Sequence, residues 1–566
     1  MKTKTYPRYE SKEYVNMREL IEDVAIRYPN RFAFSYRHKP TDAAAERVSF
    51  LAFRNDVRAL ATEMLAHGMH GKHCAIIGKL TYPWVCTYFA LLSIGAVAVP
   101  LDKDWHEEEL AKTVAHADCE FLFCDEKPTS RTELILKQAG IASAVYLTGG
   151  EGKDSVATWI ESGRERLEEG DRSYFKAVIR PLSLSILVFT SGTTGSGKGV
   201  MLSQNGLMQD LYAGLKQVSL SKKTVAVLPP HHTYGCNVGL VAHVAAGCEV
   251  YLSDGLRYIQ RELREEKPEH LTLVPLFIET FYRRILSTAK EQGKDKLLSR
   301  MIKMSNAMRK VGVDMRRSVF QSVLATFGGE LRLVISGGAP ISREILETFD
   351  ALGISVINGY GITECSPLIS VSHQLAPVGN SVGRPLACNK VKLRDPNADG
   401  EGEICVRGAN VMMGYYKNDE ATEEAFDEDG YFRTGDYGKF DRNGNLQITG
   451  RLKNLIILSN GKNVYPEEIE NDLAATPGIL EIVVYEGQSR RGVEHNAIVA
   501  EIYPDAAYLE KLGVSDPLAY FQKTVDTYNR SAVAYKKIAM LKIRTEEFPK
   551  NTLRKILRYR MDTSID

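Results

Sequence analysis

Residues 189–201 read Phe-Thr-Ser-Gly-Thr-Thr-Gly-Ser-Gly-Lys-Gly-Val-Met and directly continue the apolar run that begins at Ile186. Glycines let a backbone turn tightly and bring N–H groups up to an anion, hydroxyl groups add donors, and a lysine supplies positive charge. Flexible serine- and glycine-rich linkers seldom follow a buried strand directly. The stretch therefore predicts a strand followed by a phosphate-binding loop, and the expected ligand is a nucleotide polyphosphate.

The spacing Gly192 to Lys198 also fits the Walker A pattern G-x-x-x-x-G-K. That pattern requires Ser or Thr after the lysine to hold Mg²⁺ at the start of a helix. Here Gly199 follows the lysine and has no side-chain oxygen, and residues 200–202 are typical of a strand. A P-loop kinase or ATPase is therefore disfavoured.

Composition limits the class of protein. The chain has 566 residues, 44% of them hydrophobic, which predicts two to four domains. Its 72 Lys and Arg balance 71 Asp and Glu, so no overall field would recruit nucleic acid or an anionic membrane. Nine scattered cysteines, without a C-x-x-C pair, indicate buried thiols in a reducing cytosol. The N-terminus lacks the apolar core of a signal peptide, so we expect a cytoplasmic protein.

Residues 80–101 carry no formal charge and are long enough for a membrane span. Pro83 near the start and Gly95 in the middle argue against one. A helix, a glycine C-cap and a buried strand ending at Leu101 explain the stretch better. We therefore expect no integral membrane span.

Short apolar runs separated by helical patterns predict an α/β fold with a doubly wound N-terminal part. The runs are 74–77, 121–124, 144–147, 185–189, 224–228, 248–252, 271–274 and 331–335. From about residue 380 to 450 the Gly- and Asp-rich turns indicate a small β-rich subdomain. We expect an N-terminal domain over 1–450, a hinge at 451–453 and a small, mobile α/β C-terminal domain over 454–566. In the C-terminal domain, a hairpin turning at Asn460-Gly461 should precede a helix that begins at Pro466.

The stretch from about 285 to 330 is basic and helical in pattern. A solvated helical insertion is the simpler interpretation, and contact with a membrane surface or a partner is the alternative.

Three further segments could complete a nucleotide site. The turn Ser336-Gly337-Gly338-Ala339-Pro340 has few side chains, so a flat ring could lie against its backbone. The segment Asn358-Gly359-Tyr360-Gly361-Ile362-Thr363-Glu364 combines an aromatic ring, a hydroxyl and a carboxylate suited to Mg²⁺. In the third, Asp436 could accept from two ribose hydroxyls, and Arg451 adds a cation fifteen residues later.

These four segments, in this order, resemble the adenylate-forming superfamily of acyl-CoA synthetases, luciferases and peptide-synthetase adenylation domains. Its signature T-S-G-T-T-G-x-P-K-G is matched from Thr190, except that Gly197 replaces proline. The resemblance covers nearly the whole chain and implies ATP, Mg²⁺ and coenzyme A as ligands. It assigns the triphosphate to Thr190, Ser191, Gly192, Thr193, Thr194, Gly195 and Lys198. It assigns adenine to Gly338, Ala339, Tyr360 and Gly361, the α-phosphate to Thr363, Mg²⁺ to Glu364, ribose to Asp436 and Arg451, and the hinge to Lys453.

The resemblance implies catalytic roles for Lys198, Thr363 and Glu364 and for two further residues, His232 and Lys555. His232 falls where relatives place an aromatic residue or histidine beside the acyl carboxylate, although a hydrogen-bonded loop histidine is the plainer reading. Lys555, in a degenerate copy of P-K-T-x-x-G-K-I-x-R with Asn551 and Arg554 at the Thr and Gly positions, matches the catalytic lysine. The alternative for that segment is a basic helix end with Leu553, Ile556 and Leu557 buried. Gly461 and Lys462 would serve the thiol-transfer step.

The implied activity is an ATP-dependent ligase that joins a carboxylic acid to coenzyme A through an acyl-adenylate, with pyrophosphate and then AMP released. The insertion before residue 336 and the segment 458–464 resemble the long-chain fatty acid branch, so a medium- or long-chain fatty acid is the expected acid. Transfer to a phosphopantetheinyl carrier protein, peripheral contact with a membrane and a non-catalytic nucleotide-binding role remain alternatives.

Overall fold

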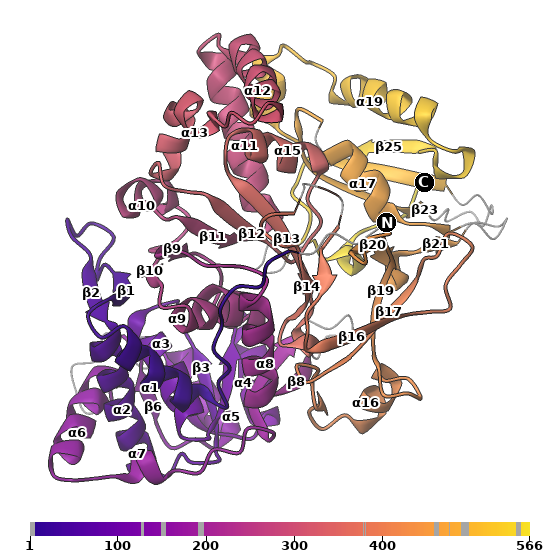
Figure 1. Cartoon of the computed structure of the whole chain (residues 1–566). Helices are drawn as coiled ribbons and strands as arrows, with labels where there is room; N and C mark the ends of the chain where they lie inside the picture. Colours follow the sequence, from indigo (N-terminus) through magenta and orange to yellow (C-terminus); the bar gives the residue numbers. More distant parts are fainter. Residues whose placement is uncertain are drawn as a thin grey trace.

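The computed structural model describes residues 6–125, 129–148, 154–190, 197–376, 379, 381–457, 463–474, 476–487, 497–550 and 556–565. Figure 1 shows a large α/β region in indigo to magenta, an orange β-rich part beside it and a small yellow α/β part at the C-terminal end. This arrangement confirms the predicted fold class.

The largest sheet carries the strand that precedes the phosphate loop. Its order is β18-β8-β7-β4-β3-β5-β6. The strands are β3 (His73–Ile77), β4 (Val97–Leu101), β5 (Cys119–Cys124), β6 (Ala144–Tyr146), β7 (Leu184–Thr190), β8 (Lys198–Ser203) and β18 (Gly414–Tyr415). Alternate residues of β3 enter different cores, Cys74 and Ile76 on one face and Ala75 and Ile77 on the other. Two buried faces explain why these strands read as continuous apolar runs.

The uncharged stretch 80–101 folds as expected for a buried crossover. It forms α3 (Tyr82–Ser93) and then β4. Gly95 has φ of +76° between the two elements, a left-handed conformation that glycine adopts without steric cost.

Two more sheets complete the large α/β region. One has the order β11-β12-β13-β14-β15 and the other β2-β1-β10-β9. The first contains β11 (His270–Leu273), β12 (Leu333–Ser336), β13 (Ser355–Gly361), β14 (Leu368–Val371) and β15 (Arg384–Pro385). The second contains β1 (Phe32–Tyr36), β2 (Glu46–Ser49), β9 (Lys223–Ala226) and β10 (Glu249–Leu252). The apolar runs did not predict β1 and β2.

The β-rich part is a four-stranded antiparallel sheet in the order β16-β17-β19-β20. The strands are β16 (Asn389–Arg394), β17 (Gly402–Gly408), β19 (Phe432–Phe440) and β20 (Leu446–Arg451). The predicted turns at Gly400 and Gly444 connect neighbouring strands, and both glycines have positive φ. The β-rich segment predicted after about residue 380 is therefore confirmed.

The C-terminal part begins with η4 (Leu452–Asn454), β21 (Ile456–Ile457) and β22 (Asn463–Val464), and the two strands pair as an antiparallel hairpin. After them come α17 (Pro466–Ala474), β23 (Ile479–Gly487), β24 (Ala497–Pro504), α18 (Ala506–Lys511), α19 (Pro517–Ser531), η5 (Ala534–Lys536), β25 (Met540–Ile543) and η6 (Arg558–Arg560). One apolar cluster is drawn from this part alone. Ile556 forms an antiparallel bridge with Lys550, so the alternative of a helix end running through Ile556 and Leu557 is wrong.

The remaining helices cover the sheets and fill the connections. They are α1 (Met17–Arg27), α2 (Phe50–Ala66), α4 (Glu107–His116), α5 (Ser130–Ala139), α6 (Val156–Glu168), α7 (Ser173–Lys176), α8 (Gln204–Leu215), the π-helix η1 (Tyr234–Val241), α9 (Ala242–Ala245), α10 (Ile259–Glu266), α11 (Pro275–Glu291), α12 (Asp295–Lys310), α13 (Arg316–Val319), α14 (Gln321–Leu324), η2 (Ala325–Phe327), α15 (Arg343–Ala351), η3 (Thr363–Cys365) and α16 (Asp419–Ala425). Within the described ranges, none is both long and apolar enough to cross a membrane.

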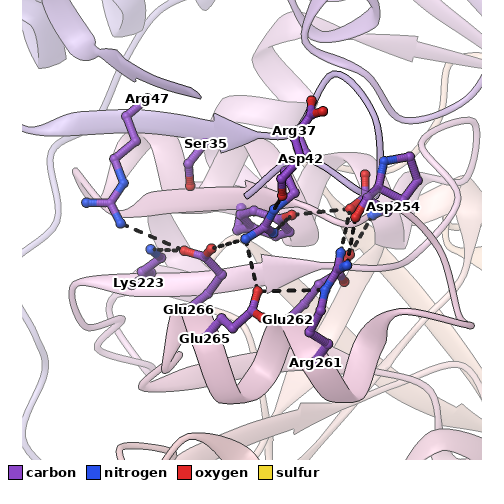
Figure 2. Close-up of polar contacts among 12 residues, drawn as sticks. Ser35, Arg37, Asp42, Arg47, Lys223, Asp254, Arg261, Glu262, Glu265 and Glu266 are labelled. Carbon is purple, nitrogen blue, oxygen red and sulfur yellow. Dashed lines mark hydrogen bonds and ion pairs between the residues drawn. The ribbon is translucent and has the colours of Figure 1, made fainter. Parts of the chain in front are cut away.

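A half-buried ionic network fixes β1 and β2 to the body of the protein. Figure 2 shows Arg37 reaching from β1 to the carboxylates of α10, with its Nη2 2.9 Å from Glu265 Oε2. Lys223 Nζ lies 2.7 Å from Glu266 Oε2. Together with the burial of Ala33 and Phe34 in the main core, these contacts hold β1 in place. β2 reads Glu-Arg-Val-Ser, with a single apolar residue, so strand hydrophobicity alone does not reveal it.

Candidate functional site

The carboxyl ends of β12 and β13 form the first part of the candidate site. The two strands are parallel neighbours, with Ser336 opposite Asn358. The turn 336–340 therefore leaves the sheet beside the last residues of β13, which include Tyr360, at the edge where open α/β sheets bind ligands. In this turn, Gly338 has φ of +91° and Ala339 is exposed. The predicted adenine residues thus share one edge.

Tyr360, Asp436 and Arg451 form one hydrogen-bonded unit. The Tyr360 hydroxyl donates to Asp436 Oδ2 across 2.8 Å, and Arg451 Nε lies 2.9 Å from Asp436 Oδ1. The pairing of β19 with β20 places Asp436 directly opposite Arg451. Burial raises the pKa of Tyr360 well above its usual value. The negative charge of Asp436 raises the pKa of Arg451, and Tyr360, Glu467 and Glu364 raise it further.

The phosphate loop is described only at its two ends, because residues 191–196, which include Ser191, Gly192, Thr193, Thr194 and Gly195, lie outside the described residues. Thr190 and Lys198 are partners in the β7–β8 ladder, so the two ends of the loop lie side by side. Lys198 is exposed, and its Nζ lies 4.6 Å from the ring centroid of Tyr415. A strand, not a helix, follows Lys198, as the failed Walker A match predicted.

Thr363 and Glu364 form the short helix η3, immediately after β13. Both are partly exposed. The hydroxyl of Tyr415 donates to Glu364 Oε1 across 2.9 Å. A Cβ on Gly361 would lie 1.9 Å from the Pro367 carbonyl oxygen, so this turn requires glycine. Tyr415 therefore contacts both the predicted Mg²⁺ carboxylate and the predicted phosphate lysine.

Sequence reasoning missed Tyr415. The residue belongs to a strand of two residues, β18, which pairs with β8 directly after Lys198. Its only sequence signal is the Gly-Tyr-Tyr triplet at 414–416, which carries no chemistry until the pairing with β8 is known.

His231 and His232 precede the π-helix η1 and lie beside a large cleft. Their ring centroids are 4.2 Å apart, and His231 Nε2 is 3.5 Å from Asp102 Oδ2. Burial lowers the pKa of His231 to about 4 and that of His232 to about 3. Both imidazoles are therefore neutral at pH 7, so each can donate one hydrogen bond and accept another without adding positive charge to the cleft.

The cleft has a volume of about 2740 Å³ and extends between the N-terminal sheets and the C-terminal part. Lys198, His231, His232 and Tyr415 line one side, and Lys550 and Leu557 line another. Lys555 lies between Lys550 and Leu557 in sequence, but it is outside the described residues. Gly461 and Lys462 are also outside the described residues. Lys453 is exposed in η4, after β20.

Glu364 also fits the expected metal. Across the part of the chain that is described, no group of three or more His, Cys, Asp or Glu side chains is arranged to hold an ion. Mg²⁺ does not require such a group, because one or two carboxylates together with substrate phosphates and waters complete its octahedron. A single accessible carboxylate beside the phosphate lysine meets that requirement.

Comparison with known proteins gives consistent results. The family profile described as "AMP-binding enzyme" matches residues 21–416. Long-chain-fatty-acid–CoA ligase 5 of Rattus norvegicus is 31% identical over 461 residues, which are 76% of this chain and 67% of that protein. Long-chain-fatty-acid–CoA ligase FadD15 of Mycobacterium bovis is 28% identical over 76% of this chain and 74% of its own length.

Solved structures share the fold. ATP-bound MatB from Rhodopseudomonas palustris has a TM-score of 0.73 at 23% identity and covers 96% of this chain and 97% of its own. The anthranilate CoA ligase AuaEII in complex with anthranoyl-AMP has a TM-score of 0.75 at 18% identity, over 99% of this chain and 98% of its own.

Proposed function

Because the chain belongs to the family of AMP-binding enzymes, we propose that it is an ATP-dependent acid:CoA ligase, which forms an acyl-adenylate and pyrophosphate and then an acyl-CoA thioester and AMP. The observation that carries the proposal is the convergence of distant segments. Tyr360 donates to Asp436 and lies at the end of β13, four positions before Glu364, and Tyr415 connects Glu364 with Lys198. The candidate ribose, metal and phosphate residues therefore adjoin one another.

The nucleotide would be held along this series of contacts. Asp436 offers carboxylate oxygens to the ribose hydroxyls, and Arg451 and Tyr360 hold that carboxylate in place. The turn at Gly338 and Ala339 leaves room for a flat base beside Tyr360. Lys198, with Thr190 and the hydroxyls of the loop 191–196, neutralises the triphosphate. Thr363 would contact the α-phosphate.

A carboxylate is a poor electrophile, and adenylation gives it a good leaving group. The work of the protein is positioning and charge neutralisation rather than covalent catalysis. When Mg²⁺ is bound, it supplies charge neutralisation at the phosphates, and Glu364 would hold it. Lys555 would neutralise charge that develops as the carboxylate attacks. Its sequence neighbours Lys550 and Leu557 line the same cleft as Lys198, which supports this role.

We propose a medium- or long-chain fatty acid as the substrate. Two relatives named as long-chain-fatty-acid–CoA ligases support this choice. The 2740 Å³ cleft, which His232 and Lys198 line, exceeds the ~300–1,000 Å³ of an ordinary small-molecule pocket, so it offers ample volume for an extended acyl chain. The neutral His232 would orient the acyl carboxylate.

An ATP–pyrophosphate exchange assay across carboxylic acids tests the proposal. Exchange should depend on a fatty acid and on Mg²⁺, and AMP rather than ADP should accumulate when coenzyme A is added. No exchange with any acid would refute it. A preference for acetate or benzoate would refute the fatty acid alone.

Two alternatives have different readouts. A ligase that loads a carrier protein would exchange pyrophosphate but would acylate a phosphopantetheinylated carrier and not free coenzyme A. A non-catalytic module would bind ATP without exchange. We also propose a domain boundary at 451–453 with Lys453 as the hinge, and a cytoplasmic location, supported by nine cysteines that form no disulfide.

A further inference from the structure

Helix α12 lies at the upper edge of the molecule, in the basic stretch between β11 and β12 (Figure 1). One of its faces is already used. Leu298 belongs to a buried cluster with Phe320 and Leu352, and Met301 and Ile302 pack against that cluster. This contact anchors the helix to the body of the protein and fixes which side faces outward.

The outward side carries a second apolar stripe. Leu297, Met304 and Val311, the last at the C-cap of α12, are exposed by 52%, 54% and 78%. They are seven residues apart, so they lie along one side of the helix. Val313 and Met315 continue the exposed apolar residues beyond it. Single exposed apolar residues are ordinary, but a series on one face marks an interaction surface.

Unpaired cations border this stripe on the side away from the buried cluster. Lys296, Arg300, Lys303 and Lys310 are exposed, and none has an ion pair with another described residue. Arg309, by contrast, forms an ion pair with Asp350 at 2.6 Å. The helix contains a single acid, Asp295. The helix therefore carries unbalanced positive charge, although the whole chain has a net charge of only +1.

We propose that this face of α12, defined by Leu297, Met304, Val311 and the four flanking cations, docks the protein on an anionic lipid surface. An amphipathic helix with apolar and basic sides binds in the plane of such an interface, with apolar groups among the acyl chains and cations at the headgroups. A nucleic acid would pair its phosphates with the cations but would leave the apolar stripe exposed to water. The docking surface is proposed independently of the ligase activity. The further idea that the docked protein takes up fatty acid dissolved in the membrane rests on the proposed function.

Vesicle co-sedimentation of the full chain, without ATP or coenzyme A, tests the surface. The protein should sediment with vesicles of phosphatidylcholine and phosphatidylglycerol, should not sediment with phosphatidylcholine alone, and should be released by high salt. The double variants Leu297→Glu/Met304→Glu and Arg300→Glu/Lys303→Glu should each lose at least about tenfold in vesicle affinity. The matched controls Ile26→Glu, at a 73% exposed site on α1, and Lys137→Glu, exposed on α5, should bind like the unaltered protein.

Equal binding to both kinds of vesicle, or no loss in the α12 variants, would overturn the proposal. So would a dimer in analytical ultracentrifugation that both α12 variants abolish, because a second copy would then cover the face. Both variants should keep full pyrophosphate exchange with a water-soluble medium-chain fatty acid supplied without vesicles, because the helix lies outside the candidate site. A protein that docks but never activates an acid would refute the proposed function and leave the surface standing.

Discussion

The hydroxyl of Tyr415 donates to Glu364 Oε1 across 2.9 Å, and the face of the same ring lies 4.6 Å from Lys198 Nζ. One side chain thus restrains the candidate metal carboxylate and the candidate phosphate lysine, which are separated by 166 positions in the sequence. Burial raises the pKa of Tyr415, so its hydroxyl keeps its proton and remains a donor. Tyr415 is therefore a positioning residue for the proposed first half-reaction.

Replacing Tyr415 with Phe should raise the Mg²⁺ concentration needed for half-maximal pyrophosphate exchange and slow exchange by about tenfold, because a hydrogen bond to a charged group is worth about 1.5–3 kcal/mol. The adjacent Tyr416→Phe is the control, since the Tyr416 hydroxyl donates to Asp118 at 2.6 Å instead. A merely structural role for Tyr415 would lower the melting temperature and leave the Mg²⁺ dependence unchanged. Equal effects in the two variants would contradict the prediction.

Asp436→Asn should weaken ATP binding by about 10- to 100-fold, because a hydrogen bond from a ribose hydroxyl to a charged carboxylate is worth about 1.5–3 kcal/mol and a neutral amide accepts more weakly. Calorimetric titration with ATP measures the loss. Glu403→Gln provides the control, since this buried carboxylate pairs with Arg433 at 3.2 Å in the same sheet. If both variants lose stability equally and neither loses ATP affinity, Asp436 has only a structural role.

Much of the fold follows from local pattern. The helix, Gly95 and buried strand of residues 82–101 are confirmed, because strand length, glycine and continuous apolarity are local properties. Tyr415 and the strands β1 and β2 could not be predicted in the same way. Tyr415 acquires its role through a two-residue pairing with β8, and Arg37, directly after β1, joins that strand to the carboxylates of α10. Both depend on residues about two hundred positions away.

Stability should fall in acid because of the two cleft histidines. Their pKa values in the folded chain, about 4 for His231 and about 3 for His232, lie below the unfolded value of about 6.5. The unfolded state therefore binds more protons as pH falls from about 6.5 to 4, and stability present above 6.5 is lost by about 1.4 kcal/mol per pH unit for each histidine.

The double variant His231→Gln/His232→Gln should show a shallower loss of unfolding free energy between pH 6.5 and 4.5 in urea titrations. His106→Gln is the control, because His106 lines the same cleft but is exposed. An unchanged slope in the double variant would mean that folding does not lower the pKa values of the two histidines.

Gly163→Ala should destabilise the protein by about 2–3 kcal/mol, because overpacking of a tight contact forces the backbone apart. A Cβ at Gly163, on α6, would lie 1.9 Å from the Ala59 carbonyl oxygen on α2. Gly214→Ala on α8 is the matched control, since its Cβ would meet Leu368 at an ordinary 3.5 Å and helix propensity favours Ala by up to about 1 kcal/mol. Thermal unfolding of both variants measures the difference in stability. A Gly163→Ala variant as stable as the unaltered protein would refute the close contact.

The two half-reactions should respond to different residues of the C-terminal part. Lys555 and the Gly461-Lys462 turn are each proposed to reach the reaction centre, the first for adenylation and the second for thiol transfer. In the structure, Lys550 and Leu557 line the cleft, and Arg283 Nη2 donates to the Leu480 carbonyl oxygen at 3.0 Å. Rotation about the exposed Lys453 would exchange the two segments.

Proline at 453 fixes the φ angle that must change, so Lys453→Pro should spare pyrophosphate exchange and suppress thioester formation. Lys453→Ala, which keeps that φ free, is its control. Lys555→Ala should do the reverse, slowing exchange while leaving thioester formation from a preformed acyl-adenylate. If Lys453→Pro and Lys555→Ala slow both half-reactions equally, the C-terminal part does not rotate between them.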